Sequence, residues 1–436
     1  MRVKTAKWKK GSRSGVVARF LERPAFDEAA ERVARRVLGA VRRDGDRAVA
    51  RYTKQFDGAV LRGADFAVGA EEMERAARRT PPAVRAAIRK AHRRIRAFSR
   101  SGKRRDWSVP TPHGGRLGER FIPYDRVGVY VPGGKAPLVS TALMTATLAE
   151  VAGVPEIVAC TPCTREGIVN PAMLFALGTA GATEVYRIGG IQAIGMMAFG
   201  TETVRPVQKI VGPGNAFVTA AKRQVYGHVD LDLVAGPSEI AVLADDSVDP
   251  RYAAADLLSQ AEHGTGAEKA MLVTDSESVL RSVAAEVDRM AARLSREGAI
   301  RRVMRSGMLF VLVPDLDTGV ELCNRFAPEH LELMVRRPRH WIRKVRAAGA
   351  VFLGPWSPEA AGDFVAGPSH VLPTGGAAAR FSGLTVDDFM RRTSVIDFRR
   401  RDLEESVATI EEFGAVEGLD AHALSARIRL QEPEAQ

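Results

Sequence analysis

The sequence has few cysteines and aromatic residues, and it contains no long apolar run. Only three cysteines occur among 436 residues, Cys160, Cys163 and Cys323. An odd, low count argues against a disulfide scaffold and favours a reducing compartment such as the cytoplasm. The absence of about 18 consecutive apolar residues argues against a membrane span. The basic stretch 1–15 lacks the apolar segment of a secretory signal, so we interpret it as a solvated tail.

The net charge of +12 first suggests a nucleic-acid partner. The basic residues are scattered, however, and their densest stretch, 78–105, has the spacing of helices with a solvated face. Aromatic residues make up 6% of the chain, and no stacking pattern interleaves with the charges as it does in RNA-binding modules. We therefore expect neither a nucleic-acid nor a membrane partner.

Apolar strands and helices alternate along most of the chain. Residues 26–100 have the apolar spacing of helices. Beyond them we expect strands at 127–131, 156–160, 184–188 and 208–211, and a second set at 239–245, 269–275, 307–313 and 349–354. Such alternation predicts parallel sheets covered by helices, that is, two doubly wound, Rossmann-like α/β domains.

The same pattern suggests a domain division. Residues 1–125, with a helical N-terminal part, and 238–380 would form the first α/β domain, and 126–237 the second. Residues 381–436 contain one clear helix, near 403–418, and are too few to hold their own core. We expect this small C-terminal tail to pack on the body or on a partner subunit.

Three predicted strand ends carry glycine-rich turns, at 132–134, 189–190 and 212–214. Such turns let backbone N–H groups face a phosphate at the start of a helix, and Asn215 stands where a helix cap would be. None matches the GxGxxG fingerprint, and Lys135 does not belong to a P-loop. The glycine-rich turns are therefore compatible both with a dinucleotide site and with ordinary strand-to-helix connections.

Histidines beside carboxylates and amides suggest a metal site. Gln260 and His263 share one face of a helix that should start at Asp249-Pro250 and end at Gly264, where the helix dipole favours a cation. Three further pairs occur in other segments: Glu329 and His330, Asp363 and His370, and Glu417 and His422. One Gln, two His and one Asp would give zinc a mixed nitrogen and oxygen shell. The Cys160–Cys163 pair is better explained by packing at a strand end.

Six motifs together resemble those of the histidinol dehydrogenase family. In chain order they are KIVGPGNAFV, AGPSE, DLLSQAEHG, FAPEHLE, GPSHVLPTGG and EGLDAH. The resemblance extends from about residue 20 to residue 430. It implies a zinc-dependent, NAD-linked oxidation of L-histidinol through L-histidinal to L-histidine, the last steps of histidine biosynthesis. It also implies two Rossmann-like domains and a homodimer in which Glu417 and His422 complete the partner's site.

The resemblance implies a role for each motif residue. His330 would be the general base, since an imidazole titrates near neutral pH, and Glu329 would activate water. One zinc ion per subunit would be held by Gln260, His263, Asp363 and His422. The amino alcohol would contact those four side chains, His330, and also Ser238, His370 and Glu417. NAD would contact Tyr130, Gln192 and Asn215.

Three positions depart from the family's commoner pattern: Ile191, Val234 and Ser369. None removes a proposed ligand or base, so they bear on the fit of the substrate. The nearest alternative is a related zinc and NAD dehydrogenase that acts on another hydroxy substrate, such as a sulfonated diol. His370 and Glu417 suit an imidazole or an ammonium group and favour histidinol. Two alternatives lie outside the class of zinc and NAD dehydrogenases. One is a metallohydrolase with Glu329 as base, and the other is a non-catalytic nucleic-acid binder.

Overall fold

The computed structural model describes residues 3–12, 14–23, 27–133, 137–233, 236–263 and 266–431. Two units of unequal size follow from the backbone contacts. The first comprises residues 1–102 and 124–389, and the second comprises 103–123 and 390–436. Val234, Gly264 and Lys135 lie outside the described residues. Within the described part, no helix is both long and apolar enough to cross a membrane.

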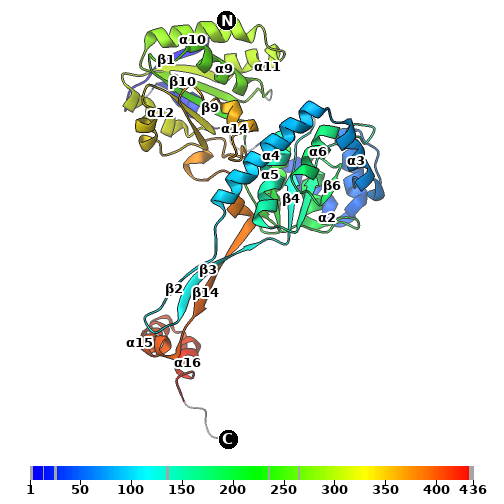
Figure 1. The fold of residues 1–436 in the computed structure, drawn as a ribbon, viewed down its shortest axis with the longest axis vertical. Helices are drawn as coiled ribbons and strands as arrows, with labels where there is room; N and C mark the ends of the chain where they lie inside the picture. Colours follow the sequence, from blue (N-terminus) through cyan, green and yellow to red (C-terminus); the bar gives the residue numbers. More distant parts are fainter. Residues whose placement is uncertain are drawn as a thin grey trace. The chain divides into compact units, whose positions relative to one another are not determined.

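Sheet B of the first unit, which includes the strands β4 and β6 labelled in Figure 1, contains five parallel strands in the order β6-β5-β4-β7-β8. The first strand of this set, β4, lies in the middle, and the next two strands lie to one side of it. Its strands are β4 (Arg126–Tyr130), β5 (Glu156–Cys160), β6 (Glu184–Tyr186), β7 (Lys209–Val211) and β8 (Asp230–Leu231). Its connecting helices are α5 (Val139–Ala152), α6 (Pro171–Thr179), α7 (Gly190–Phe199) and α8 (Ala216–Val225).

Sheet A of the same unit has six parallel strands in the order β1-β11-β10-β9-β12-β13. Besides β1, which belongs to the N-terminal segment, its strands are β9 (Glu239–Ala244), β10 (Lys269–Thr274), β11 (Met308–Leu312), β12 (His330–Met334) and β13 (Ala350–Leu353). Its helices are α9 (Pro250–Ala261), α10 (Glu277–Ala291), α11 (Glu297–Ser306), α12 (Leu316–Phe326), α13 (Pro338–Trp341) and α14 (Glu359–Phe364). Both sheets thus have the predicted doubly wound, Rossmann-like arrangement, with buried apolar strands.

The basic N-terminus is not a solvated tail, contrary to our expectation. Residues Lys4–Lys7 form β1, which pairs in parallel with β11 at one edge of sheet A. Trp8 follows with 5% of its surface exposed, and helix α1 (Gly15–Leu21) buries Val17 and Phe20 in the same core. Because strand pairing satisfies the backbone and apolar side chains are spaced between the lysines, this basic segment can join a sheet edge.

The predicted helical segment forms α2 (Glu28–Asp57), α3 (Ala70–Arg79) and α4 (Pro82–Gly102). These helices pack against the helices of sheet B: α2 against α7 and α8, α3 against α6, and α4 against α5. Val37 and Val41 of α2 share a buried cluster with Ile194 of α7. This packing differs from the expected grouping of residues 1–125 with 238–380, because the apolar faces of these helices meet sheet B. The chain passes from sheet B to sheet A between Leu231, the end of β8, and Glu239, the start of β9.

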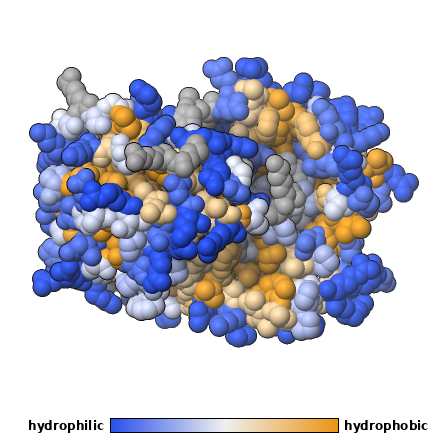
Figure 2. Space-filling model, turned by 90° about the horizontal axis from the view of Figure 1, so that it is seen from above, coloured by the Kyte–Doolittle hydropathy of each residue, from blue (hydrophilic) through white to orange (hydrophobic). Residues whose placement is uncertain are grey.

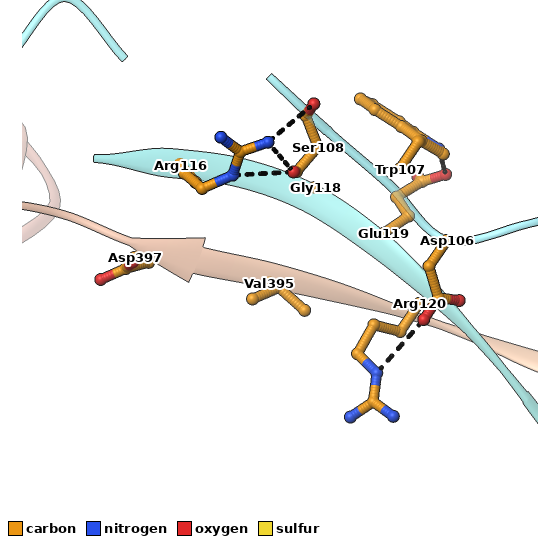
Figure 3. A pocket seen from close by; sticks show the side chains of 9 residues that line it. All are labelled: Asp106, Trp107, Ser108, Arg116, Gly118, Glu119, Arg120, Val395 and Asp397. Atoms are coloured by element: carbon orange, nitrogen blue, oxygen red, sulfur yellow. Dashed lines mark hydrogen bonds and ion pairs between the residues drawn. The ribbon is translucent and has the colours of Figure 1, made fainter. Parts of the chain in front are cut away.

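The second unit is built on an antiparallel sheet that the sequence did not suggest. It contains β2 (Trp107–Pro110), β3 (Arg116–Pro123) and β14 (Met390–Asp397) in the order β14-β3-β2, with helices α15 (Arg400–Glu417) and α16 (Asp420–Arg427). A hollow of about 410 Å³ lies on this sheet, lined by Trp107, Arg116, Arg120 and other residues (Figure 3). In it, Arg116 contacts Ser108 and Arg120 contacts Asp106, and none of the predicted site residues lines it.

The surface view agrees with a body whose apolar side chains are mainly internal. In Figure 2, hydrophilic residues cover much of the visible face, and apolar residues form patches between them. The largest buried side chains include Phe310 and Phe326 around sheet A and Met144 and Leu148 around sheet B. The two sheets therefore provide rigid, packed supports for the side chains at their edges.

Candidate active site

The candidate site lies at the amino edge of sheet A. Ser238 directly precedes β9, and Glu329 and His330 stand at the start of β12. Helix α9 returns from the opposite edge, so its last turn brings Gln260 to the same place. Asp249 caps the start of α9 as predicted, by accepting a hydrogen bond from the N–H of Arg251 at 2.9 Å. Sequence-distant side chains therefore meet because strand starts and a helix end share one edge.

His330 is buried, with 3% of its surface exposed, and its two ring nitrogens have different partners. Nδ1 lies 3.2 Å from Oε1 of Gln260, and Nε2 lies 3.7 Å from Oδ1 of Asp363. Because an amide oxygen only accepts, Nδ1 carries the proton and the Nε2 lone pair is left for a base. Burial, together with nearby His263 and His370, lowers the pKa of His330 to about 3, below the near-neutral value we expected. The ring is therefore neutral.

His263 lies two residues beyond the end of α9 rather than within its last turn. Its Nδ1 is 3.2 Å from the backbone carbonyl oxygen of Gln260, which can only accept a hydrogen bond. The same Nδ1 lies 3.5 Å from Nε2 of Gln260, which can only donate, so the two contacts favour opposite tautomers. The shorter contact favours a proton on Nδ1, which leaves Nε2 as the atom that can bind a metal. His263 is exposed, so this nitrogen is accessible from outside the protein.

Glu359 belongs to the site, although the sequence analysis missed it. Ligand atoms of His330, Glu359 and Asp363 lie within 4.8 Å of one another. Burial raises the pKa of Glu359 to about 7, to which Asp363 adds, and burial raises the pKa of Asp363 to about 6. The four-residue spacing of Glu359 and Asp363 on α14 was the signal that could have found it.

The donor set at this edge fits a divalent cation. One carboxyl oxygen of Glu359 accepts from Ser259 at 2.8 Å, and the other, Oε1, is buried. The Glu359 side chain is also hydrogen-bonded to the carboxyl group of Asp363, which requires a proton between the two groups when no cation is bound. Buried carboxylates this close repel one another unless a cation or protons intervene. An imidazole nitrogen with several oxygens is a shell that zinc accepts.

Glu329 is held beside His330 by the start of β9. Its Oε2 accepts a hydrogen bond from the backbone N–H of Glu239 at 3.1 Å, and its side chain is also hydrogen-bonded to Ser238. Burial raises the pKa of Glu329 well above its usual range, and the charge of Asp363 adds to this shift. Glu329 therefore holds a proton readily when no cation is near.

His370 links this site to sheet B. Its Nδ1 lies 3.0 Å from the backbone oxygen of Asp363, and its Nε2 lies 3.1 Å from the hydroxyl of Thr141, in the first turn of α5. Burial lowers the pKa of His370 to about 4. The neighbouring Ser369 donates to the carbonyl of Met144 at 2.9 Å, so this departure from the family pattern also anchors the loop to α5.

The three predicted cofactor residues lie at the carboxyl edge of sheet B. Tyr130 ends β4, and its hydroxyl accepts a hydrogen bond from the N–H of Gly190 at 3.1 Å. Gln192 is fully buried in the first turn of α7. Asn215 caps α8 as predicted, by accepting from the N–H groups of Phe217 and Val218 at 3.0 and 3.1 Å. Ile191 is buried in α7 and does not reach the site at sheet A.

A buried ion pair fixes the glycine turn that precedes Asn215. Asp232 accepts from the N–H of Gly212 at 2.7 Å, and Nζ of Lys222 donates to the Gly212 carbonyl at 2.9 Å and to Asp232. The exposed fractions of the two charged side chains are 2% and 0%. A Cβ atom at Gly212 would lie 2.1 Å from the backbone carbonyl oxygen of Tyr130, so only glycine allows the ends of β7 and β4 to approach this closely.

Glu417 and His422 belong to the second unit. Glu417 ends α15, His422 lies in α16, and both side chains are exposed. Their proposed contribution to the site of a partner subunit stays a prediction. The three cysteines are free, with Cys160 and Cys323 buried.

Two doubly wound parallel sheets, with a histidine and carboxylate cluster at one edge and glycine turns at another, are typical of α/β enzymes. The family profile described as histidinol dehydrogenase matches residues 21–430. The chain belongs to the histidinol dehydrogenase family, and it is an oxidoreductase.

Individual relatives agree with this assignment over nearly the whole chain. It is 45% identical to the histidinol dehydrogenase of Heliobacterium mobile, over 94% of this chain and 96% of the relative. It is 46% identical to that of Parasynechococcus marenigrum, over 90% of each. The crystal structure of histidinol dehydrogenase from Elizabethkingia anophelis matches with a TM-score of 0.92 and 34% identity, over 98% of both chains.

Proposed function

We propose that the chain oxidises L-histidinol through L-histidinal to L-histidine, with zinc and two molecules of NAD. One observation carries the proposal: Gln260, His330 and Asp363, with His263 close by, converge at the amino edge of sheet A. Family membership supports the reaction, and the buried donor set supports the metal.

The described residues suggest where each group would bind. Gln260, His263 and Asp363 would hold zinc, with His422 of a second chain as the fourth ligand, and Glu359 would support Asp363 from α14. Zinc would orient the amino alcohol and offset the crowded carboxylates, which lowers the pKa of Glu329 and Asp363. Tyr130, Gln192 and Asn215 would hold NAD, which accepts the hydride in each oxidation.

His330 would take the proton in the first oxidation. Its neutral ring offers Nε2 to the hydroxyl proton of the alcohol while a hydride leaves the same carbon. Asp363, whose Oδ1 lies 3.7 Å from Nε2, would stabilise the imidazolium that forms. In the second oxidation Glu329 would take a proton from water as it adds to the aldehyde, and the resulting diol would lose a second hydride to give the carboxylate.

A direct assay tests this function. The purified protein is mixed with L-histidinol and NAD, and NADH is followed by its absorbance before and after treatment with a chelator. We expect two NADH for each histidinol, loss of turnover on chelation, and its return with added zinc. Absence of NADH formation by zinc-loaded protein would contradict the proposal, and turnover of another hydroxy substrate alone would favour the related dehydrogenase.

The exposed Glu417 and His422 support a homodimer in which the tail of each chain completes the partner's site. Mixing two inactive variants, His330→Ala and His422→Ala, tests this arrangement. Random exchange of chains should restore about a quarter of the wild-type activity, because half of the dimers then contain one intact site. No recovery after proven subunit exchange, or an active monomer in sedimentation, would count against it. A cytoplasmic location stays a prediction.

A further inference from the structure

Asp57 brings a carboxylate to the carboxyl edge of sheet B from outside its strand–helix units. It is the last residue of α2, and it is half-buried. Its Oδ2 accepts a hydrogen bond from Nε2 of Gln192 at 3.2 Å. Burial raises the pKa of Asp57 to about 6, against the effect of the Gln192 hydrogen bond, so the carboxyl group is ionised at pH 8.

The surroundings of Asp57 are the ends of two central strands. Burial raises the pKa of Tyr130, the last residue of β4, to about 12, and the Asp57 charge contributes. Burial also raises the pKa of Cys163, just after β5, to about 11, again with a contribution from Asp57. The contacts agree with this position: Asp57 accepts from Gln192 in the first turn of α7, whose Gly190 donates to Tyr130 at the end of β4. The next residue, Gly58, lies against Arg165, which follows β5.

This position has a known chemical meaning in a doubly wound sheet. Where such a sheet binds a dinucleotide, an acidic residue near the end of the second strand accepts hydrogen bonds from the adenosine ribose hydroxyls. The residues after β5 here, Thr161 to Glu166, place no acidic side chain directly at the strand end. Asp57 supplies the missing carboxylate from α2.

Two further observations point to a ligand beside Asp57. Oε1 of Gln192 is buried and lacks a hydrogen-bond partner among the described residues. Arg165, which is exposed, lies against Gly58: a Cβ placed there would be 3.1 Å from its Cγ and 3.2 Å from its Nε. A carboxylate and a guanidinium thus flank the same edge, and an arginine is the group that accommodates a ribose 2′-phosphate.

We propose that Asp57 selects the dinucleotide: it binds the adenosine ribose diol of NAD and repels the 2′-phosphate of NADP, which Arg165 would otherwise attract. This inference rests on the proposed use of NAD. Asp57 would contact the cofactor far from the reacting carbon, so it should change cofactor affinity and leave the chemical step unchanged.

The test compares four proteins at pH 8: the wild type, Asp57→Asn, Asp57→Glu and the double variant Asp57→Asn/Arg165→Ala. NADH and NADPH binding is titrated by fluorescence without histidinol, and kcat and KM are measured with both oxidised cofactors. Asp57→Asn should reduce the preference for NAD about 10- to 100-fold, through KM, because one charged hydrogen-bond acceptor is lost and one repulsion removed. Asp57→Glu should retain the preference, and the double variant should lose the gain toward NADP.

Asp44→Asn is the matched control, since it removes the same charge from the part of α2 that precedes the break in the helix at Gly45. An unchanged cofactor preference in folded Asp57→Asn, or an equal change in Asp44→Asn, would overturn the role of Asp57 while wild-type turnover with NAD still supports the proposed function. If the wild type binds neither NADH nor NADPH, the proposed function itself fails, and the inference fails with it.

Discussion

The two parallel sheets of the first unit share a strand order but present opposite edges to their predicted ligands. In sheet B, Tyr130 ends a strand and Asn215 caps the following helix. In sheet A, Ser238 and Glu329 precede their strands, and Gln260 lies at the end of a helix. The first edge is formed by strand ends and helix starts, and the second by strand starts and helix ends.

The difference follows from the polarity of the helices. Helices α7 and α8 begin at the edge of sheet B, where the partial positive charge of a helix start suits the phosphates of a dinucleotide. Helix α9 ends at the edge of sheet A, where the partial negative charge suits a cation. Strand order alone therefore does not locate a site, because the choice of edge depends on the charge of the ligand.

Removal of the proposed base, His330, should lower turnover more than any other change considered and should leave zinc binding at the edge of sheet A unchanged. His330→Ala should lower kcat about 10²- to 10⁴-fold, since the neutral ring proposed to take the hydroxyl proton is lost. Zinc content should stay near one per chain by elemental analysis. His340→Ala, which changes an exposed histidine of α13, should retain full activity. Unchanged turnover in His330→Ala would remove its role.

Loss of the buried ion pair between Lys222 and Asp232 should disrupt the carboxyl edge of sheet B. Lys222→Met leaves the Asp232 carboxylate buried without its cation, which should destabilise the fold by about 3–5 kcal/mol in urea unfolding. The Gly212 turn should loosen as well, so KM for NAD should rise more than KM for histidinol. Arg205→Met removes an arginine whose side chain is 70% exposed and should change little. Equal stability of both variants would show that the pair contributes nothing.

Asp363→Asn tests the edge of sheet A. Zinc affinity should fall at least about 100-fold, because a ligand is replaced by a weaker one, and competition with a coloured chelator measures this. Asp275→Asn, at the opposite edge of the same sheet, is the control. Burial and the charges of other aspartates, Asp245 among them, also raise the pKa of Asp275. Asp275 lies just before α10, however, where the partial positive charge of a helix start disfavours a cation. Loss of zinc in both variants would contradict the assignment of the cation to one edge.

The smallest predicted effect concerns the contact between α5 and His370. Thr141→Val should raise KM for histidinol about tenfold at unchanged zinc content, because Nε2 of His370 loses its partner and the ring its fixed orientation. Thr141→Ser should restore the wild-type value. Thr147→Val is the control, since that hydroxyl is buried on the same helix and has no hydrogen-bond partner within the part of the chain that the structure describes. Nitrogen NMR of the His370 ring would report the change directly.

Most of the strands could be predicted because they are apolar runs bounded by turns, but β12 could not. Its central residue, Glu332, is a carboxylic acid that is only 1% exposed, and burial raises its pKa well above the usual range, so a polar residue interrupts the apolar run of the strand that carries His330. Glu332 is tolerated there because it accepts the N–H of Glu359 at 2.9 Å and is hydrogen-bonded to Asp256. Such compensation comes from distant residues and leaves no local pattern.

The motif residues of the candidate site could be predicted from the sequence, but the residues that contact and hold them could not. Gln260, His263, His330 and Asp363 could be chosen from residue type and resemblance. Glu359 and Thr141 act through contacts that only the packing of α14 and α5 creates. The strands of the second unit were missed for a related reason: β3 and β14 mix charged and apolar residues, and nearly all of these residues are exposed or half-buried, so they carry no buried apolar run.

The pairing of β1 with β11 has a consequence for how the chain is made. Lys4 lies opposite Leu309 and Lys7 opposite Leu312, so β1 can pair only after β11, about 300 residues further along the chain, has been synthesised. Sheet B, whose strands all fall within Arg126–Leu231, can form in the meantime. The order of synthesis therefore favours early folding of sheet B, and the N-terminal strand closes sheet A as a late, long-range event.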